Sequence, residues 1–381
     1  MLVGTMSSDC TRRQCLGLLG LALLTRPSPA ATSSALAVLH EGGSRWSRFE
    51  GQGLSMRRER DLPLSMAAWL AQGLAAGDDG TLLAIDPVNG GVHARRRIGT
   101  ARPRAARSRD GRWYAVLPAD AHEWQLLDAG LRTVKRWPLP SPATWLTDAP
   151  HRQAFLLGLA DPAQLWVLSY DERAEDFYEG LVHDYRMGEG VPQRGFHNVR
   201  RMALPAPLMD PSLDAESTEL AGQAMVFNLD VRKVVARPAA LRPPGAGTAA
   251  LASGGSRLLV PVRGARGVEV FTTGDWRHLG TIATDAAVAR MLPLGGRLLA
   301  LPEPAAGARQ LATLDARTLQ PLPPWPLPGP FVDAAPASDG RALWLQLGGE
   351  AEGVACLDSA DGRVTARRGL AGVRALQALD G

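Results

Sequence analysis

Side chains able to do chemistry are concentrated between Leu181 and Arg201, where the sequence reads LVHDYRMGEGVPQRGFHNVRR. His183 and His197 are two of the chain's seven histidines, and acids, arginines and a tyrosine surround them. Two histidines without a third ligand at a suitable spacing do not form a typical zinc site. His183, His197 and Arg200 could instead contact the edge of a bound cofactor or a partner protein. The alternative is a solvated loop.

The glycines of this stretch indicate a defined loop conformation. Gly188, Gly190 and Gly195 can adopt positive φ angles that other residues avoid, so we expect a shaped loop. We interpret the stretch as a lid that faces a ligand or a partner, and not as a catalytic loop.

The elements that must position this lid follow from a repeat that runs through the chain. Each copy is an apolar run ending in Asp, then a turn and a second short run, as in LLAIDPVNGGV and VACLDSADGRV. The repeat aspartates are Asp86, Asp128, Asp171, Asp230, Asp275, Asp315 and Asp358. Further upstream, LAVLHEGGSRW places His40 in the same position, which makes eight copies.

Repeats of about 40–50 residues built from short β-rich runs are typical of β-propeller blades. Short apolar runs bounded by Asp, Gly and Pro indicate strands, and long helical periodicity is absent. The sequence therefore predicts an all-β fold, a single eight-bladed β-propeller over residues 31–381. The interval from Asp171 to Asp230 is the longest between repeat aspartates, and the lid lies in this excess length.

Residues 1–30 are predicted to be an export signal. Arg12 and Arg13 precede a short apolar run at 16–24, and Ser28-Pro29-Ala30 offers a small-residue cleavage site. Paired arginines here are typical of a twin-arginine signal, with a general secretory signal as the alternative. The apolar run is too short to span a bilayer, so we expect a periplasmic protein without a membrane span.

Composition excludes several function classes. Residues 1–30 hold half of the formal net charge of +4, so little positive charge remains to bind nucleic acid. Lys135 and Lys233 are the only lysines, and arginine suits planar carboxylates better than lysine does. Cys356 is the one cysteine beyond the predicted signal, which leaves no internal disulfide. No C-x-x-C-H motif is present, so a c-type haem is excluded.

Several phrases, taken in order, carry a resemblance to a known family. They are GDDGTLLAID from Gly77, RIGTARPRAARSRDGRWYAVL from Arg97 and PHRQAFLLGLADPAQLWVL from Pro150. They resemble blades of the haem d1 propeller of cytochrome cd1 nitrite reductases and related haem d1 biosynthesis proteins, the cytochrome D1 domain family. The resemblance covers residues 60–370 through loose motifs. It implies an eight-bladed propeller that binds haem d1 and serves denitrification.

The sequence departs from this family at the haem-ligand histidines. Where the family has an axial histidine, this chain has Met66 or its neighbour Ser65. The Met66 thioether could ligate haem iron, but a methionine on a strand more often fills the core. Where the family has two distal histidines, this chain has Pro244 and Arg263. Arg263 could hold an anion but does not readily release a proton. The usual nitrite reduction is therefore not expected.

The resemblance also implies arginines that bind the carboxylates of haem d1. Arg57 and Arg58 precede Met66, and Arg102 and Arg104 fall where the family has a propionate-binding arginine. Guanidinium groups pair with carboxylates through two parallel hydrogen bonds. The alternative for each arginine is a solvated loop.

Two hypotheses of different classes remain. The first is a periplasmic cytochrome d1-like propeller that binds haem d1 or a related tetrapyrrole for maturation, transfer or electron exchange, with proteins of nitrite respiration or haem maturation as partners. Its enzymatic status stays open. The second is a haem-free propeller that acts as a scaffold for other proteins, and an absent cofactor is equally compatible with the sequence.

Overall fold

The structure is a computed structural model that describes residues 34–119, 122–179, 191–209, 211–213, 217–222, 225–236, 250–252, 255–262, 264–273 and 275–379. Its described residues form eight four-stranded antiparallel sheets, and the sheets are the blades of a β-propeller. The predicted all-β, eight-bladed fold is confirmed. The predicted export signal at residues 1–30 lies outside the described residues.

The blades are numbered in chain order around the ring, beginning with the blade that contains β1. The strands of each blade are given from the centre outward. Blade 1 is β34 (Ala375–Leu379), β1 (Ala35–His40), β2 (Arg45–Glu50) and β3 (Ser55–Asp61); blade 2 is β4 (Ala68–Ala71), β5 (Leu74–Ala76), β6 (Thr81–Ile85) and β7 (Val92–Arg97); blade 3 is β8 (Arg104–Arg107), β9 (Trp113–Leu117), β10 (Glu123–Asp128) and β11 (Thr133–Pro138); blade 4 is β12 (Ala143–Ala149), β13 (Ala154–Ala160), β14 (Ala163–Ser169) and β17 (Val199–Ala203). Blade 5 is β18 (Ser212–Leu213), β19 (Glu219–Gly222), β20 (Met225–Asn228) and β21 (Lys233–Ala236); blade 6 is β22 (Ala250–Ala252), β23 (Arg257–Pro261), β24 (Gly267–Thr272) and β25 (His278–Ala283); blade 7 is β26 (Val288–Leu294), β27 (Arg297–Pro302), β28 (Gln310–Asp315) and β29 (Pro321–Pro326); blade 8 is β30 (Phe331–Pro336), β31 (Ala342–Leu347), β32 (Gly353–Asp358) and β33 (Val364–Gly369).

The position of a strand within its blade explains its sequence. The middle strand β6 is buried along its whole length, and its sequence is TLLAI. The outermost strand β7 (VHARRR) has exposed or half-buried side chains throughout. The turn between them is fixed by Asp86, whose carboxylate accepts the N–H of Val88 at 2.7 Å, and by Gly90 at a φ of 71°. Asx geometry and a glycine in the left-handed region end the apolar run here.

The ring closes by pairing the two ends of the described chain. β34 near the C-terminus pairs with β1 near the N-terminus, so that Ala35 lies opposite Leu379 and, on its other side, opposite Glu50. Blade 1 therefore takes its innermost strand from the C-terminus. Closure leaves no blade without its inner strand and removes an exposed sheet edge.

This closure corrects one prediction about the repeat. The repeat aspartates follow the third strand of their blades, whereas His40 ends β1, the second strand of blade 1. Glu50, at the end of the third strand β2, occupies the equivalent place. The eighth copy of the repeat exists, but the predicted position of His40 within it was wrong by one strand. The reason is that the first described strand, β1, is the second strand of its blade and not the third.

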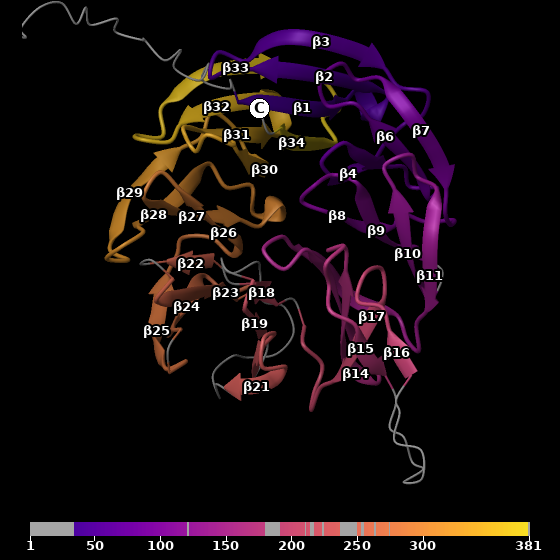
Figure 1. Cartoon of the computed structure of the whole chain (residues 1–381). Coiled ribbons are helices and arrows are strands. Elements are labelled where there is room, and N and C mark those ends of the chain that lie inside the picture. The colour runs from indigo at the N-terminus through magenta and orange to yellow at the C-terminus, as the bar shows by residue number, and fades with distance from the viewer. Residues whose placement is uncertain are drawn as a thin grey trace, which may run out of the picture. The chain divides into compact units, whose positions relative to one another are not determined.

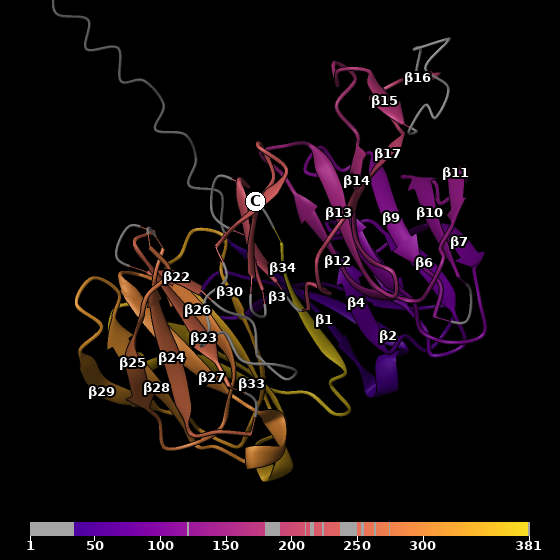
Figure 2. The same ribbon diagram turned by 90° about the horizontal axis from the view of Figure 1, so that it is seen from below.

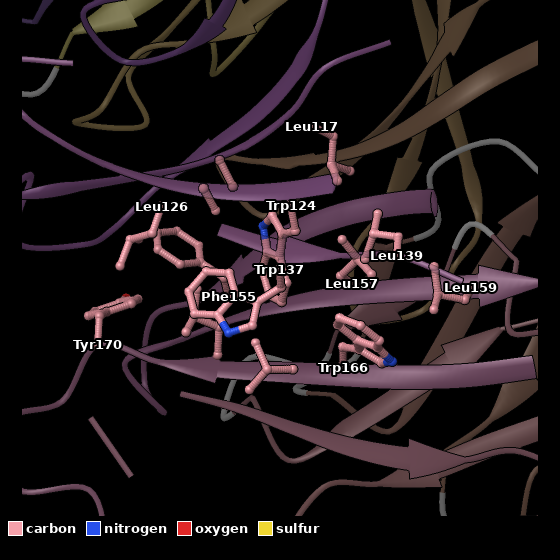
Figure 3. Close-up of a cluster of buried hydrophobic side chains, with 14 residues drawn as sticks. Leu117, Trp124, Leu126, Trp137, Leu139, Phe155, Leu157, Leu159, Trp166 and Tyr170 are labelled. Atoms are coloured by element: carbon pink, nitrogen blue, oxygen red, sulfur yellow. The ribbon is translucent and has the colours of Figure 1, made fainter. Parts of the chain in front are cut away.

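The hydrophobic core lies between neighbouring blades. Between blades 3 and 4, the rings of Trp124 and Trp137 are 5.8 Å apart and those of Phe155 and Tyr170 are 5.0 Å apart (Figure 3). Truncating such a buried aromatic side chain to Ala typically costs about 3–5 kcal/mol. Packing of this kind fixes the angle between the two blades.

The ends of the strands define two ends of the propeller. The crossover end carries the passages from one blade to the next and the turns between second and third strands, including the short 3-10 helices Glu41–Gly43, Pro304–Ala306 and Gly349–Ala351. The hairpin end carries the remaining turns and an inserted two-stranded hairpin, β15 (Phe177–Glu179) and β16 (Val191–Gln193). Figure 2 shows β15 and β16 standing beyond the rest of the blades on that side.

The inserted hairpin accounts for the long repeat interval. It lies between β14 and β17 of blade 4, so the predicted lid joins the third strand of that blade to the fourth. None of the helical segments in the described ranges has the length and apolar character that crossing a membrane requires.

Candidate functional site

The innermost strands border the centre of the ring. Unlike the fully buried β6, strand β4 is half-buried along its length, and β8 begins with the exposed Arg104. In Figure 1 the strands β4, β8, β18, β26, β30 and β34 surround the centre. Polar side chains on these strands therefore have access to whatever occupies the centre.

Arg104 lies at the crossover end of the centre. It begins β8, and its guanidinium donates a hydrogen bond to the carbonyl of Thr144 on the innermost strand of the next blade. This bond orients the guanidinium but leaves its side chain exposed. The remaining N–H groups can serve a carboxylate at the ring centre.

Arg290 lies opposite, near the same end. It is in β26 of blade 7, four blades from β8, and Figure 1 shows the two strands facing each other across the centre. Its guanidinium donates to the carbonyl of Ala334 at 2.6 Å and lies 3.4 Å from the carboxylate of Asp333. With 36% of its side chain exposed, Arg290 is held by the neighbouring strand and still reaches solvent.

The other predicted arginines lie apart from this pair. Arg102 is exposed in the passage between β7 and β8 at the crossover end, near Arg104 in the chain. Arg57 and Arg58 are on β3, the outermost strand of blade 1, where Arg57 pairs with Glu50 at 2.9 Å. Arg57 and Arg58 are thus placed on the rim of the ring and not at its centre.

Met66 is packed in the core between blades 1 and 2. Its side chain is 1% exposed and belongs to an apolar cluster with Leu39, Trp46, Leu83 and other side chains. Its backbone N–H donates to the carbonyl of Gly43 at 3.0 Å. Met66 as an iron ligand stays a prediction, but its surroundings are those of a core methionine.

The described centre fits carboxylates better than it fits iron. Within the described innermost strands the sequence contains no histidine, cysteine or tyrosine, and the one methionine, Met291, is 2% exposed. No group of three or more potential ligands among the described residues could hold a metal ion. Arg104 and Arg290 would therefore hold a haem d1-type group by its carboxylates, without an axial ligand from these strands.

The hairpin end carries a second polar cluster, between blades 3 and 4. The hydroxyl of Tyr170 donates to the carboxylate of Asp148 at 2.8 Å and accepts the N–H of Arg109 at 3.3 Å. Burial is the main cause that raises the pKa of Asp148 to about 6. It also raises the pKa of Tyr170, which keeps its hydroxyl protonated as a donor.

His197 belongs to the same end. Its φ is 54°, and its backbone N–H donates to the carbonyl of Ser169 at 2.9 Å. Its ring stacks on Phe196 at 3.7 Å and meets Trp113 edge-on at 4.4 Å. Burial, and then the charge of Lys135, lower its pKa to about 4. His197 is thus a neutral packing residue at the base of the insertion.

Arg200 completes the described part of the predicted lid. It is on β17, with its guanidinium 4.7 Å from the ring centre of Phe177 on the inserted hairpin. The predicted site residues His183 and Arg263 lie outside the described residues, as does Pro244.

The predicted set therefore belongs to two different places. Met66, Arg102 and Arg104 are at or near the crossover end, whereas His197 and Arg200 are at the hairpin end. A strand of five to seven residues separates the ends by roughly 17–23 Å. One flat ligand lying at the crossover end cannot contact both groups. The structure therefore separates His197 and Arg200 from Arg104 along the blades, and their contact with a cofactor or a partner stays a prediction.

Sequence reasoning missed Arg290, Asp148 and Tyr170. Tyr170 directly precedes the repeat aspartate Asp171, in WVLSYD, but nothing in the repeat shows that it reaches Asp148. Arg290 could have been predicted by taking the first strand after each passage between blades as the innermost strand of the next blade.

No protein-family model matches the sequence, and no curated protein sequence does. Among solved structures, the chain is similar to dihydro-heme d1 dehydrogenase NirN in complex with DHE, with a TM-score of 0.70 and 20% identity over 90% of this chain and 74% of that chain. It is also similar to a functionally unknown protein from Desulfotomaculum acetoxidans, with a TM-score of 0.53 and 11% identity over 91% of this chain and 99% of that chain.

A further similarity is to Kuenenia stuttgartiensis hydrazine synthase, with a TM-score of 0.50 and 11% identity over 79% of this chain and 98% of that chain. At these identities the comparisons show the fold. The predicted resemblance is confirmed at that level: this chain is an eight-bladed propeller whose fold is similar to that of dihydro-heme d1 dehydrogenase NirN.

Proposed function

We propose that this propeller binds a carboxylate-bearing tetrapyrrole, haem d1 or a precursor of it, at the crossover end of the ring centre. The observation that carries the proposal is the placement of Arg104 and Arg290. They lie on innermost strands of opposite blades, each is oriented by a carbonyl of the neighbouring blade, and each keeps contact with solvent. Arg102 supplies a third guanidinium near the same end.

The chemistry of these groups favours binding over catalysis. Arginine pairs with carboxylates but does not readily give or take a proton, so Arg104 and Arg290 would hold and orient the ligand. A bound haem d1 would supply redox chemistry. Without an iron ligand from the described innermost strands, we assign the protein to maturation, transfer or electron exchange and not to nitrite reduction.

The setting of this function is the periplasm. The sequence of residues 1–30 supports export, and the fold likeness to dihydro-heme d1 dehydrogenase NirN supports a place beside haem d1 biosynthesis. Proteins of nitrite respiration or haem maturation are the partners that this setting implies. A role for the chain in haem d1 biosynthesis belongs to the same proposal.

A haem-free scaffold is the second candidate function. The burial of Met66 in an apolar cluster supports it, because a family-like axial ligand at this position would have to be accessible. A scaffold would use the ends of the propeller as docking surfaces and would leave the centre without a ligand.

Absorption spectroscopy separates the two functions. The mature protein is titrated with haem d1, and the Soret and long-wavelength bands are followed. The tetrapyrrole proposal expects saturable band shifts at micromolar concentrations. Unchanged bands at those concentrations would contradict the tetrapyrrole proposal and favour the scaffold.

A further inference from the structure

A small cavity of about 230 Å³ lies at the hairpin end, beside blade 4 and away from the proposed tetrapyrrole site. Its walls come from blade 4 and from the base of the insertion. They are formed by Arg152, Ala154, Val167, Ser169, Asp171, Ala174, Glu175, Phe177, Gly195, Asn198 and Arg200.

The base of the insertion is held in place by contacts within the described part of the chain. The carboxylate of Asp176 accepts the N–H of Gly195 at 3.1 Å, which ties the two arms of the insertion together. A side chain at position 195 would come within 2.5 Å of the carbonyl oxygens of Ala174 and Glu175, so only glycine allows this approach. The wall that carries Glu175 and Phe177 is therefore fixed against β17.

Arg200 is the uncommitted cation of the cavity. Its guanidinium lies over the ring of Phe177 at 4.7 Å, which fixes its plane, and the described chain offers it no ion pair. The other arginine, Arg152, is committed to the Asp230 carboxylate of blade 5 and to the carbonyl of Leu229 at 3.5 Å. Burial and the nearby charge of Arg232 lower the pKa of Arg200. An added anionic group would relieve this unfavourable environment.

Glu175 and Asp171 are the acids of the cavity. Glu175 is close enough to raise the pKa of Arg200, yet the two side chains form no ion pair. One oxygen of Asp171 accepts the N–H of Arg173 at 2.9 Å, and its carboxylate has a second oxygen to offer. Ala154, Val167 and Phe177 add apolar surface.

We propose that this cavity binds a neutral α-amino acid as its zwitterion. The carboxylate would pair with Arg200, the ammonium group would be accepted by Glu175 and Asp171, and the side chain would lie against Val167 and Phe177. A plain anion would meet the two acids, and a plain cation would meet Arg200, so only a ligand with both charges satisfies the walls. The inference does not depend on the proposed tetrapyrrole function.

Calorimetry with three matched probes tests the ligand class. L-leucine carries both charges, 4-methylpentanoate lacks the ammonium group and 3-methylbutan-1-amine lacks the carboxylate. The full protein is expected to bind L-leucine about tenfold or more tighter than either analogue, since each analogue leaves one charged group unpaired. No heat with L-leucine up to millimolar concentration overturns the proposal. Equal binding of 4-methylpentanoate also overturns it and indicates a simple anion site.

Matched variants test the placement. Arg200→Gln should weaken L-leucine binding about tenfold or more, whereas Arg201→Gln should not, because Arg201 stacks on Trp166 from the other face of the same strand. Glu175→Gln should also weaken binding, with Glu172→Gln as the control, since Glu172 pairs with Arg112 at 2.7 Å outside the cavity. Wild-type affinity in Arg200→Gln or in Glu175→Gln would contradict the assignment. The two variants report independently if one fails to fold.

Discussion

Tyr170 donates a hydrogen bond to the Asp148 carboxylate over 2.8 Å, and the same hydroxyl accepts the N–H of Arg109 from the neighbouring blade. One phenol thus joins blade 3 to the innermost strand of blade 4 at the hairpin end. The bond favours the ionised carboxylate, but burial outweighs it and raises the pKa of Asp148 to about 6.

The Asp148→Asn variant should change how stability depends on pH. With a folded-state pKa of about 6 and a value near 4 in the unfolded chain, the native protein binds more protons between these values. Stability from this group is therefore greatest below about pH 4 and falls as pH rises to about 6. Relative to wild type, Asp148→Asn should gain about 2–3 kcal/mol in the free energy of unfolding between pH 4 and pH 7. Urea unfolding at both values measures it, and a constant difference would show that Asp148 does not titrate as described.

The His197→Asn variant should show the opposite dependence. The pKa of His197 is lowered to about 4, so the unfolded chain takes up a proton first as pH falls below about 6.5. Its contribution is present above about pH 6.5 and is lost as pH falls to about 4. Asn tolerates the φ of 54° but cannot titrate, so the stability advantage of wild type over the variant should shrink by about 2–3 kcal/mol across this range. The exposed His151→Asn serves as control, and a similar loss in both variants would refute the role of His197.

The Gly90→Ala variant should destabilise the packing between blades 1 and 2. Gly90 has a φ of 71°, and a Cβ there would lie 2.3 Å from the fully buried ring of Trp46. Gly51 has a similar φ of 65° with open space around it. Gly51→Ala should lower the free energy of unfolding by about 1 kcal/mol, because of its backbone conformation alone. Gly90→Ala should lower it by about 1–3 kcal/mol more than Gly51→Ala does, because of the clash with Trp46. Chemical denaturation of both variants gives the comparison, and equal losses would mean that Trp46 moves aside.

The Met66→Leu variant tests the residue that stands where the resembling family has its axial histidine. Because Met66 is 1% exposed among apolar side chains, Leu should fill the same space at a cost below about 1.5 kcal/mol. We expect the absorption spectrum of the protein mixed with haem d1 to be the same in variant and wild type. A shifted spectrum in a normally folded variant would restore Met66 as a ligand.

The repeat predicts the blades because each blade repeats a local pattern of apolar strands and Asp or Gly turns. The register of blade 1 could not be predicted in the same way. Its innermost strand comes from Ala375–Leu379, more than three hundred residues from its partner β1, and only ring closure shows that β1 is a second strand.

The candidate site could be predicted only in part. Arg104 follows from a motif, but its position at the ring centre depends on which strand of each repeat lies innermost. Arg104 and Arg200 lie at opposite ends of their blades, and the sequence motifs do not indicate this difference. The pair of Asp148 and Tyr170 arises from the hydrogen-bonded packing of one blade against the next, which a one-dimensional pattern does not contain.

The central claim is that Arg104 and Arg290 hold a tetrapyrrole at the crossover end. Its most direct test is the dissociation constant for haem d1 of the Arg104→Gln/Arg290→Gln protein. The matched control is Arg107→Gln, which removes an arginine from the other end of β8, where its guanidinium bonds Gln72 at 2.8 Å. The account predicts binding at least about tenfold weaker in the double variant and unchanged in the control. Equal affinity in all three proteins, with each variant folded, would contradict it.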